Sequence, residues 1–148
     1  MFRGINAITL DLKGRLAVPT RYREALASSL VVTIDTEEPC LLLYPMAQWQ
    51  VIEGNLQRLP SFNPAARRIQ RLLIGHATDI DIDTQGRVLL PMLLRDYAHL
   101  EKRVVMIGQG NKFELWDDEL WQSKREQWLI DEATQGDGLP DEMKTFAL

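Results

Sequence analysis

The chain has 148 residues, of which 45% are hydrophobic and 26% charged, as is typical of folded globular domains. Its single cysteine, Cys40, excludes an internal disulfide, and no CxxC or His-rich spacing supports a structural zinc site. No apolar run approaches the roughly 20 residues that span a bilayer, and the N-terminus lacks the pattern of a secretory signal. We therefore expect a cytoplasmic protein with no cofactor and no metal.

Charge is distributed unevenly along the chain. The net charge is −4, and the segment from Asp131 to the C-terminus, with five acids and one base, accounts for all of it. Residues 1–34 carry five basic side chains against two acidic ones, and residues 54–78 carry four arginines and no acid. The overall charge argues weakly against a polyanionic partner, whereas these local basic regions allow one.

The first third of the chain predicts a small unit of strands and helices. In chain order we expect a strand at 5–10, a turn at 11–14, a strand at 15–18 and a short helix at 21–27. Two strands at 31–34 and 40–44 and a helix at 46–59 follow. The turn has Asp at its start and Gly near its end, the residue types that tight turns favour. We expect the strands on its two sides to pair with each other as a hairpin.

A further helix is predicted from Pro64 to Ile74, with Asn63 as its N-cap. The apolar residues expected to face inward are Ile69, Leu72 and Leu73. The arginines expected on the remaining surface are Arg67, Arg68 and Arg71. Two interpretations of these arginines stay open: they touch phosphate, or they form a solvated face or an inter-subunit contact to acids such as Glu37 and Glu38.

The pattern then repeats. The segment from Asp11 to Pro19 (DLKGRLAVP) matches that from Asp83 to Pro91 (DTQGRVLLP) at an offset of 72 residues, and the match extends to Arg23 and Arg95. The second series has a strand at 76–82, a turn at 83–86, a strand at 87–90 and a helix at 92–98. Strands at 104–107 and 113–116, joined by a loop at 108–111, and a helix at 117–134 complete it.

Four segments follow from this repetition. They are repeat 1 at 5–52, connecting helices at 53–75, repeat 2 at 76–122, and a C-terminal helix with an acidic tail at 123–148. One unit of four short strands closes no core alone, so we expect the two copies to pack about a pseudo-twofold axis in an α+β fold.

Several motifs resemble the bacterial MraZ family of SpoVT-AbrB-like transcription factors. They are MFRG at 1–4, DLKGRL at 11–16, DTQGRV at 83–88, LRDYA at 94–98 and FELW at 113–116. The resemblance implies two tandem AbrB-like repeats that form a swapped-hairpin β-barrel with flanking helices. It also implies a nucleoid-associated, sequence-specific regulator of the division and cell-wall gene cluster, assembled as a ring-shaped homo-oligomer on double-stranded promoter DNA.

The two turns are the candidate DNA-binding sites. A guanidinium that follows a tight turn can pair bidentately with guanine or with phosphate, so we expect DNA contacts from Arg15, Lys13 and Arg87. The residues expected to shape the turns are Asp11, Gly14, Asp83 and Gly86. The alternative is that each Asp–Arg pair is only an ion pair that pins its turn. The second turn has Gln85 in place of the lysine, so we expect the first turn to be the stronger contact.

Two alternatives to DNA binding remain. Alternating Asp79, Asp81 and Asp83 could hold a hard metal ion in an enzyme, although solvated carboxylates are the more common outcome. A GxG at 108–110 without a third glycine is a weak cofactor signal, and no nucleophile–base pair is evident, so no catalytic residue is expected. A non-enzymatic assembly or partner-binding module remains the second alternative.

Overall fold

The computed structural model describes residues 1–27, 29–134, 138–143 and 145–146. Residues Met1–Asp118 form one compact unit and Glu119–Leu148 a second. Asp137, which belongs to the expected acidic tail, lies outside the described residues. No helix in the described ranges has the length and apolar character needed to cross a membrane.

Along the chain, pairs of strands are separated by one or two helices. The strands are β1 (Phe2–Thr9), β2 (Arg15–Ala17), β3 (Leu30–Ile34), β4 (Leu41–Pro45), β5 (Thr78–Ile80), β6 (Arg87–Leu89), β7 (Arg103–Gly110) and β8 (Phe113–Asp117). The helices are α1 (Thr20–Arg23), α2 (Met46–Gln57), α3 (Pro64–Gly75), α4 (Met92–Tyr97), α5 (Asp118–Thr134) and the 3-10 turn η1 (Asp141–Met143). The chain is therefore an α+β protein.

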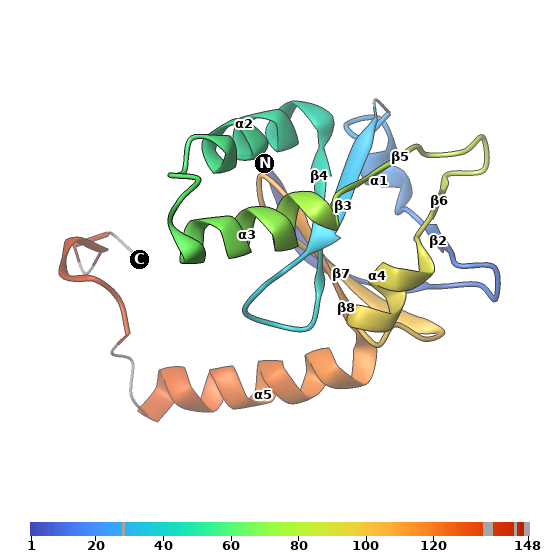
Figure 1. The fold of residues 1–148 in the computed structure, drawn as a ribbon. Coiled ribbons are helices and arrows are strands. Elements are labelled where there is room, and N and C mark those ends of the chain that lie inside the picture. The colour runs from blue at the N-terminus through green and yellow to red at the C-terminus, as the bar shows by residue number, and fades with distance from the viewer. Residues whose placement is uncertain (28, 135–137, 144, 147–148) are drawn as a thin grey trace. The chain divides into compact units, whose positions relative to one another are not determined.

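Six strands form one antiparallel sheet in the order β1-β7-β8-β4-β3-β5, and β2 pairs with β6 in a separate two-stranded ladder (Figure 1). An offset of 72 residues, or 73 for the third strand, relates β1 to β5, β2 to β6, β3 to β7 and β4 to β8. Read inward from either edge, the sheet has the first strand of one repeat, followed by the third and the fourth strand of the other repeat. The first strand of each repeat thus pairs with the third strand of the other, which supports the expected pseudo-twofold arrangement.

The predicted hairpin is reduced to its closing pair. Leu10, the last residue of the expected first strand, forms an isolated antiparallel bridge with Leu16. The rest of that strand, β1, pairs instead with β7 along eight residues, from Phe2 opposite Gly110 to Thr9 opposite Arg103. The long ladder satisfies more backbone groups than pairing with the three-residue β2 could. The closed barrel is also not observed: within the described residues the six-stranded sheet ends at β1 and β5 and stays open.

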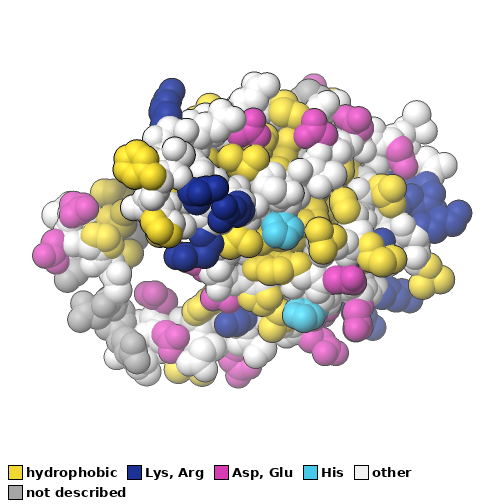
Figure 2. Space-filling model, viewed as in Figure 1, with side chains coloured by type: hydrophobic (Ala, Val, Ile, Leu, Met, Phe, Trp, Pro, Cys, Tyr) yellow, Lys and Arg dark blue, Asp and Glu magenta, His cyan; other side chains and the backbone are white. Residues whose placement is uncertain are grey.

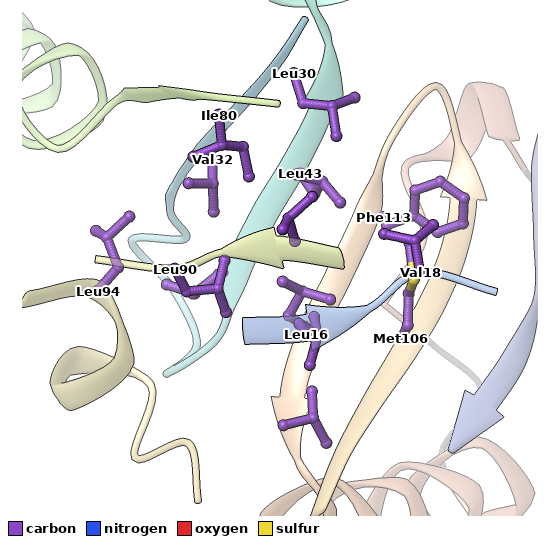
Figure 3. Packing of buried hydrophobic residues seen from close by; sticks show 14 of the residues in the cluster. Leu16, Val18, Leu30, Val32, Leu43, Ile80, Leu90, Leu94, Met106 and Phe113 are labelled. Atoms are coloured by element: carbon purple, nitrogen blue, oxygen red, sulfur yellow. The ribbon is translucent and has the colours of Figure 1, made fainter. Parts of the chain in front are cut away.

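The core is built from both repeats. Leu16 of β2 and Val88 of β6 lie opposite each other, and both are buried. They join buried residues of the large sheet in one hydrophobic cluster, of which Figure 3 shows Leu16, Val18, Leu30, Val32, Leu43, Ile80, Leu90, Leu94, Met106 and Phe113. Because burial of apolar area is the main stabilising term in folding, neither repeat is complete without the other.

A smaller cluster lies under α2. Trp49 packs there with buried residues of β3 and β4, namely Val31, Leu42 and Tyr44. Ile52 and Leu56 pack against the same cluster, as the helical spacing predicts. Asn63 caps α3 through its side-chain oxygen, which accepts hydrogen bonds from the amides of Ala65 and Ala66.

Two predictions about the helices, the burial of Ile69 and the length of the first helix, need correction. Ile69 of α3 is 39% exposed, because α3 turns Ala66 inward and Gln70 toward α2, where Gln70 Nε2 donates to the Leu56 carbonyl at 2.7 Å. The helix expected over 21–27 is the single turn α1, and residues 24–26 continue as a turn although Glu, Ala and Leu are good helix formers.

Two boundaries around the second repeat also differ. The strand expected over 76–82 covers only Thr78–Ile80, since His76 is the C-cap of α3. The loop expected at 108–111 is largely strand, because β7 continues to Gly110 along the full length of β1. Gly108 permits this pairing: a Cβ there would collide with the Arg3 backbone nitrogen.

Candidate nucleic-acid interface

The first turn is closed by the Asp11 carboxylate. Its Oδ1 accepts hydrogen bonds from the amides of Lys13 at 2.9 Å and Arg15 at 2.8 Å. The Asp11 amide donates to the Arg15 carbonyl at 2.9 Å, and the Gly14 amide donates to the Asp11 carbonyl at 3.0 Å. Gly14 has a φ of 87°, in the left-handed region that favours glycine. Asp11 and Gly14 therefore shape this turn.

The second turn repeats the same contacts. Asp83 Oδ1 accepts from the amides of Gln85 at 2.8 Å and Arg87 at 2.9 Å, and the Gly86 amide donates to the Asp83 carbonyl at 3.0 Å. Gly86 has a φ of 77°. The sequence repeat is thus reproduced bond for bond in the two turns.

These hydrogen bonds stabilise the ionised carboxylates. The backbone amide of Arg15 is the largest cause that lowers the pKa of Asp11, and the amide of Arg87 plays the same part in lowering the pKa of Asp83. The positive charge of Arg15 further lowers the pKa of Asp83, across the boundary between repeats. Both aspartates are therefore anionic acceptors at neutral pH.

The arginines form intramolecular ion pairs. Arg15 Nε lies 2.8 Å from Asp11 Oδ2, and Arg87 Nε lies 3.6 Å from Asp83 Oδ2. Arg87 Nη1 also lies 3.8 Å from Asp11 Oδ2, which links the two turns directly. The Arg15 and Arg87 side chains keep 32% and 27% exposure. Each Asp–Arg pair thus pins its turn, while part of each guanidinium still faces solvent.

The antiparallel β2–β6 ladder is only three residues long, and each turn adjoins the end of the other repeat's strand. Arg15 lies opposite Leu89, and Ala17 lies opposite Arg87. The Leu90 amide donates to the Gly14 carbonyl and the Val18 amide to the Gly86 carbonyl, both at 2.9 Å. Residues 72 positions apart in the chain therefore form one two-turn surface, defined here as residues 11–15 and 83–87.

Basic side chains gather along this edge. Figure 2 shows Lys and Arg side chains where the turns project, and a second basic group over α3. Lys13 is exposed at the tip of the first turn, beside Leu12, which is fully exposed. At the second turn Gln85 occupies the corresponding place. The exposed Asp79 and Asp81 line a pocket together with Lys13 of the first turn. The first turn itself therefore carries one basic side chain more than the second.

Two further arginines contact the turns, and their role was not predicted. Arg23 Nε donates to the Val18 carbonyl at 2.9 Å, and Arg95 Nε donates to the Leu90 carbonyl at 3.0 Å. The Arg95 guanidinium lies against Gly14, and the Arg23 guanidinium lies against Gly86. The sequence repeat does mark these two arginines as equivalent, because both stand four residues after a motif proline. The sequence cannot show which turn each arginine contacts.

Other candidate sites are less developed. Among the described residues, the potential metal ligands that converge within 4.8 Å are Asp35, Cys40 and Glu114, a set that does not include the Asp79–Asp81–Asp83 series. Cys40 is buried, its thiol donates to Asp35 Oδ2 at 3.7 Å, and burial raises the pKa of the thiol. Burial likewise raises the pKa of Glu114. Cys40 is therefore a protonated, unreactive thiol.

An α+β fold with an open sheet built from two repeats, and with one Asp–Gly–Arg turn from each repeat at either end of a short shared ladder, defines a class of tandem-repeat proteins. A family model described as "MraZ protein, putative antitoxin-like" matches residues 1–72 and again 73–135. The chain belongs to the MraZ family.

Relatives match along the full length of both chains. A protein of Legionella pneumophila strain Philadelphia 1 is 74% identical over 152 aligned positions, and one of Coxiella burnetii strain RSA 493 is 55% identical. A third, from Alkalilimnicola ehrlichii, is also 55% identical. Each of these relatives is named Transcriptional regulator MraZ.

Proposed function

We propose that this protein is a transcriptional regulator that binds double-stranded promoter DNA in a sequence-specific manner and catalyses no reaction. The full-length relatives at 74% and 55% identity carry the name of a transcriptional regulator. The DNA contacts would come from Arg15, Lys13 and Arg87, with Asp11, Gly14, Asp83 and Gly86 holding the turns. Its target would be repeated motifs at the promoter of the division and cell-wall gene cluster.

The observation that carries this proposal is the pairing of the two turns. The β2–β6 ladder links two arginines of equivalent sequence position, each partly exposed and ion-paired with the aspartate of its own turn. A guanidinium held in one orientation loses less entropy when it pairs with guanine O6 and N7 or with a phosphate. The ion pairs seen in the free protein are therefore compatible with a role in DNA contact.

The first turn would contribute more to affinity. It presents Lys13 as an additional point charge, whereas Gln85 in the second turn is neutral. Arg87 also shares its charge between Asp83 and Asp11. The second turn would then serve more to complete the two-turn surface than to bind.

A homo-oligomeric ring would explain how a chain of net charge −4 binds DNA. Several two-turn surfaces, spaced to meet short repeated motifs, would add their weak contacts through effective concentration. In this proposal residues 5–52 and 76–122 are the two SpoVT-AbrB-like repeats, and the exchanged strand pairing corresponds to swapped hairpins. The assembly would act in the cytoplasm, associated with the nucleoid.

The test is a mobility-shift titration on promoter DNA with wild type, Arg15→Ala and Arg87→Ala. Arg15→Ala should abolish the specific shift without unfolding the protein, because the side chain lies at the surface. Arg87→Ala should weaken it less. The slope of log affinity against log salt should become shallower, since each lost phosphate contact lowers it by roughly one unit. Lys13→Gln, which gives the first turn the second turn's residue, is the matched control for charge and should weaken binding only partly.

Unchanged binding by Arg15→Ala would overturn this assignment of residues. If wild type fails to bind any promoter fragment even in low salt, the alternative of an assembly or partner-binding module takes its place. In that case the Asp–Arg pairs serve only to pin the turns.

A further inference from the structure

We propose that each turn of the two-turn surface is positioned by an arginine of the other repeat: Arg95 holds the first turn and Arg23 holds the second. The positioning itself is a property of the free protein. Its consequence for DNA affinity rests on the proposed function above.

Arg95 reaches the first turn from α4, which belongs to the second repeat. Its Nε donates to the Leu90 carbonyl at 3.0 Å, and the Leu90 amide donates to the Gly14 carbonyl at 2.9 Å. Leu90 therefore bonds to Arg95 through one backbone group and to the first turn through the other. The guanidinium itself lies against the backbone of Gly14.

Arg23 makes the same contacts from the first repeat. Its Nε donates to the Val18 carbonyl at 2.9 Å, and the Val18 amide donates to the Gly86 carbonyl at 2.9 Å. Its guanidinium lies against Gly86. Because the two arrangements occur independently in the two halves of the protein, the contact is a built feature of the repeat and not a chance packing of one side chain.

The arginine also explains the turn glycine. Positive φ alone would admit Asn at some cost, as it does in many turns. A Cβ on Gly14, however, would lie 2.6 Å from the Arg95 Cζ atom, too close for any side chain unless the guanidinium moves away. The planar guanidinium thus fills the space that glycine leaves and limits the movement of the turn backbone.

The two turns are consequently coupled. The orientation of the Arg15 guanidinium depends on the backbone of residues 11–15, which Arg95 supports from the other repeat. The contact of Arg87 Nη1 with Asp11 Oδ2 adds a second link in the same direction. Arg95 and Arg23 are therefore positioning residues, and they act on the turn opposite to the one in their own repeat.

Double-mutant cycles in DNA affinity test this crossed coupling. Arg95→Met keeps the side-chain length and removes the guanidinium. It should lower affinity about tenfold both in wild type and in Arg87→Ala, because the first turn that it supports is intact in both. Arg23→Met is the matched control: it should lower affinity in wild type and add little in Arg87→Ala, where the turn it supports no longer binds. An equal further loss for the two variants in Arg87→Ala would overturn the proposal, because a general electrostatic effect is not turn-specific.

Arg95→Lys separates positioning from charge. Lysine keeps the charge but lacks the planar group that lies on Gly14, so it should lose affinity as Arg95→Met does. Near-normal affinity for Arg95→Lys would show that Arg95 supplies charge to phosphate and would overturn the positioning role.

A measurement on the DNA-free protein keeps this test independent of the proposed function. In Arg95→Met the NMR amide signals of Gly14 and Arg15 should shift and their hydrogen exchange accelerate, while those of Gly86 and Arg87 change little. Arg23→Met should affect the second turn in the same selective way. If Arg15→Ala leaves DNA binding intact, the proposed function fails, but these signals still decide whether each arginine holds the opposite turn.

Discussion

Gly14 and Gly54 differ in what a methyl group would meet, although both are glycines of the first half of the chain. Gly14 has positive φ and lies against Arg95, whereas Gly54 lies within α2 with open space where a Cβ would be. We predict that Gly14→Ala destabilises the protein by about 1–3 kcal/mol, from backbone strain and displacement of the guanidinium. Gly54→Ala should be neutral or stabilising by up to about 1 kcal/mol, because alanine is the better helix former. Urea unfolding of the two variants measures both effects, and equal stabilities would contradict the turn geometry.

The turn aspartates give the two turns a defined pH dependence. The pKa values of Asp11 and Asp83 are lowered in the folded protein, chiefly by backbone amides, from an ordinary value of 3.8. Their contribution to stability is therefore fully present above about pH 4 and is lost as the pH falls through the lower folded-state pKa. We predict that amide protection of Lys13 and Arg15 is constant from neutral pH to about pH 5 and declines only in stronger acid.

NMR titration of the Asp11 carboxyl together with hydrogen exchange checks this prediction. Asp11→Asn is the control: its amide side chain cannot ionise, so the acid-dependent loss of protection should vanish at the first turn and persist at the second. A carboxyl that titrates above its ordinary value would contradict the hydrogen bonding described for the turn.

At the scale of elements, the β2–β6 ladder depends on its buried residues more than on its length. Each strand has only three residues, but Leu16 is fully buried beside Val88 in the main core. We predict that Leu16→Ala costs about 2–5 kcal/mol, as expected for a large buried side chain. Leu12→Ala, a change of the same chemistry at a fully exposed turn position, should alter stability by less than about 0.5 kcal/mol. Thermal unfolding of the pair measures the difference; similar melting temperatures would contradict the packing of β2.

The same elements show what the sequence could and could not predict. The repeat, the turn residues, the buried strand Leu41–Tyr44 and the capped helix at Pro64 all follow from local chemistry and periodicity. The partner of each strand does not, because a strand's pattern states which face is buried and leaves open which edge will pair. Hence β1 was expected beside β2 and instead lies beside β7. The contacts of Arg23 and Arg95 could not be predicted for the same reason. They depend on which turn packs against each arginine, and that follows from the strand pairing between the repeats.

At the scale of the whole molecule, two basic regions face different directions. The two-turn surface projects from one side of the unit formed by Met1–Asp118, and α3 lies on the other (Figures 1 and 2). Arg67, Arg68 and Arg71 are exposed on α3, as the sequence predicted. We therefore expect DNA bound at the two turns to leave the α3 face of the same chain uncovered. Substituting the α3 arginines then controls for a general loss of positive charge.

The most direct test of the account is footprinting on the region upstream of the protein's own gene, with wild type, Arg15→Ala and the double variant Arg67→Ala/Arg71→Ala side by side. Wild type and the double variant should protect the same short repeated motifs, and Arg15→Ala, although folded, should protect none. Protection of those motifs by Arg15→Ala at the wild-type concentration would contradict the claim that the first turn reads DNA.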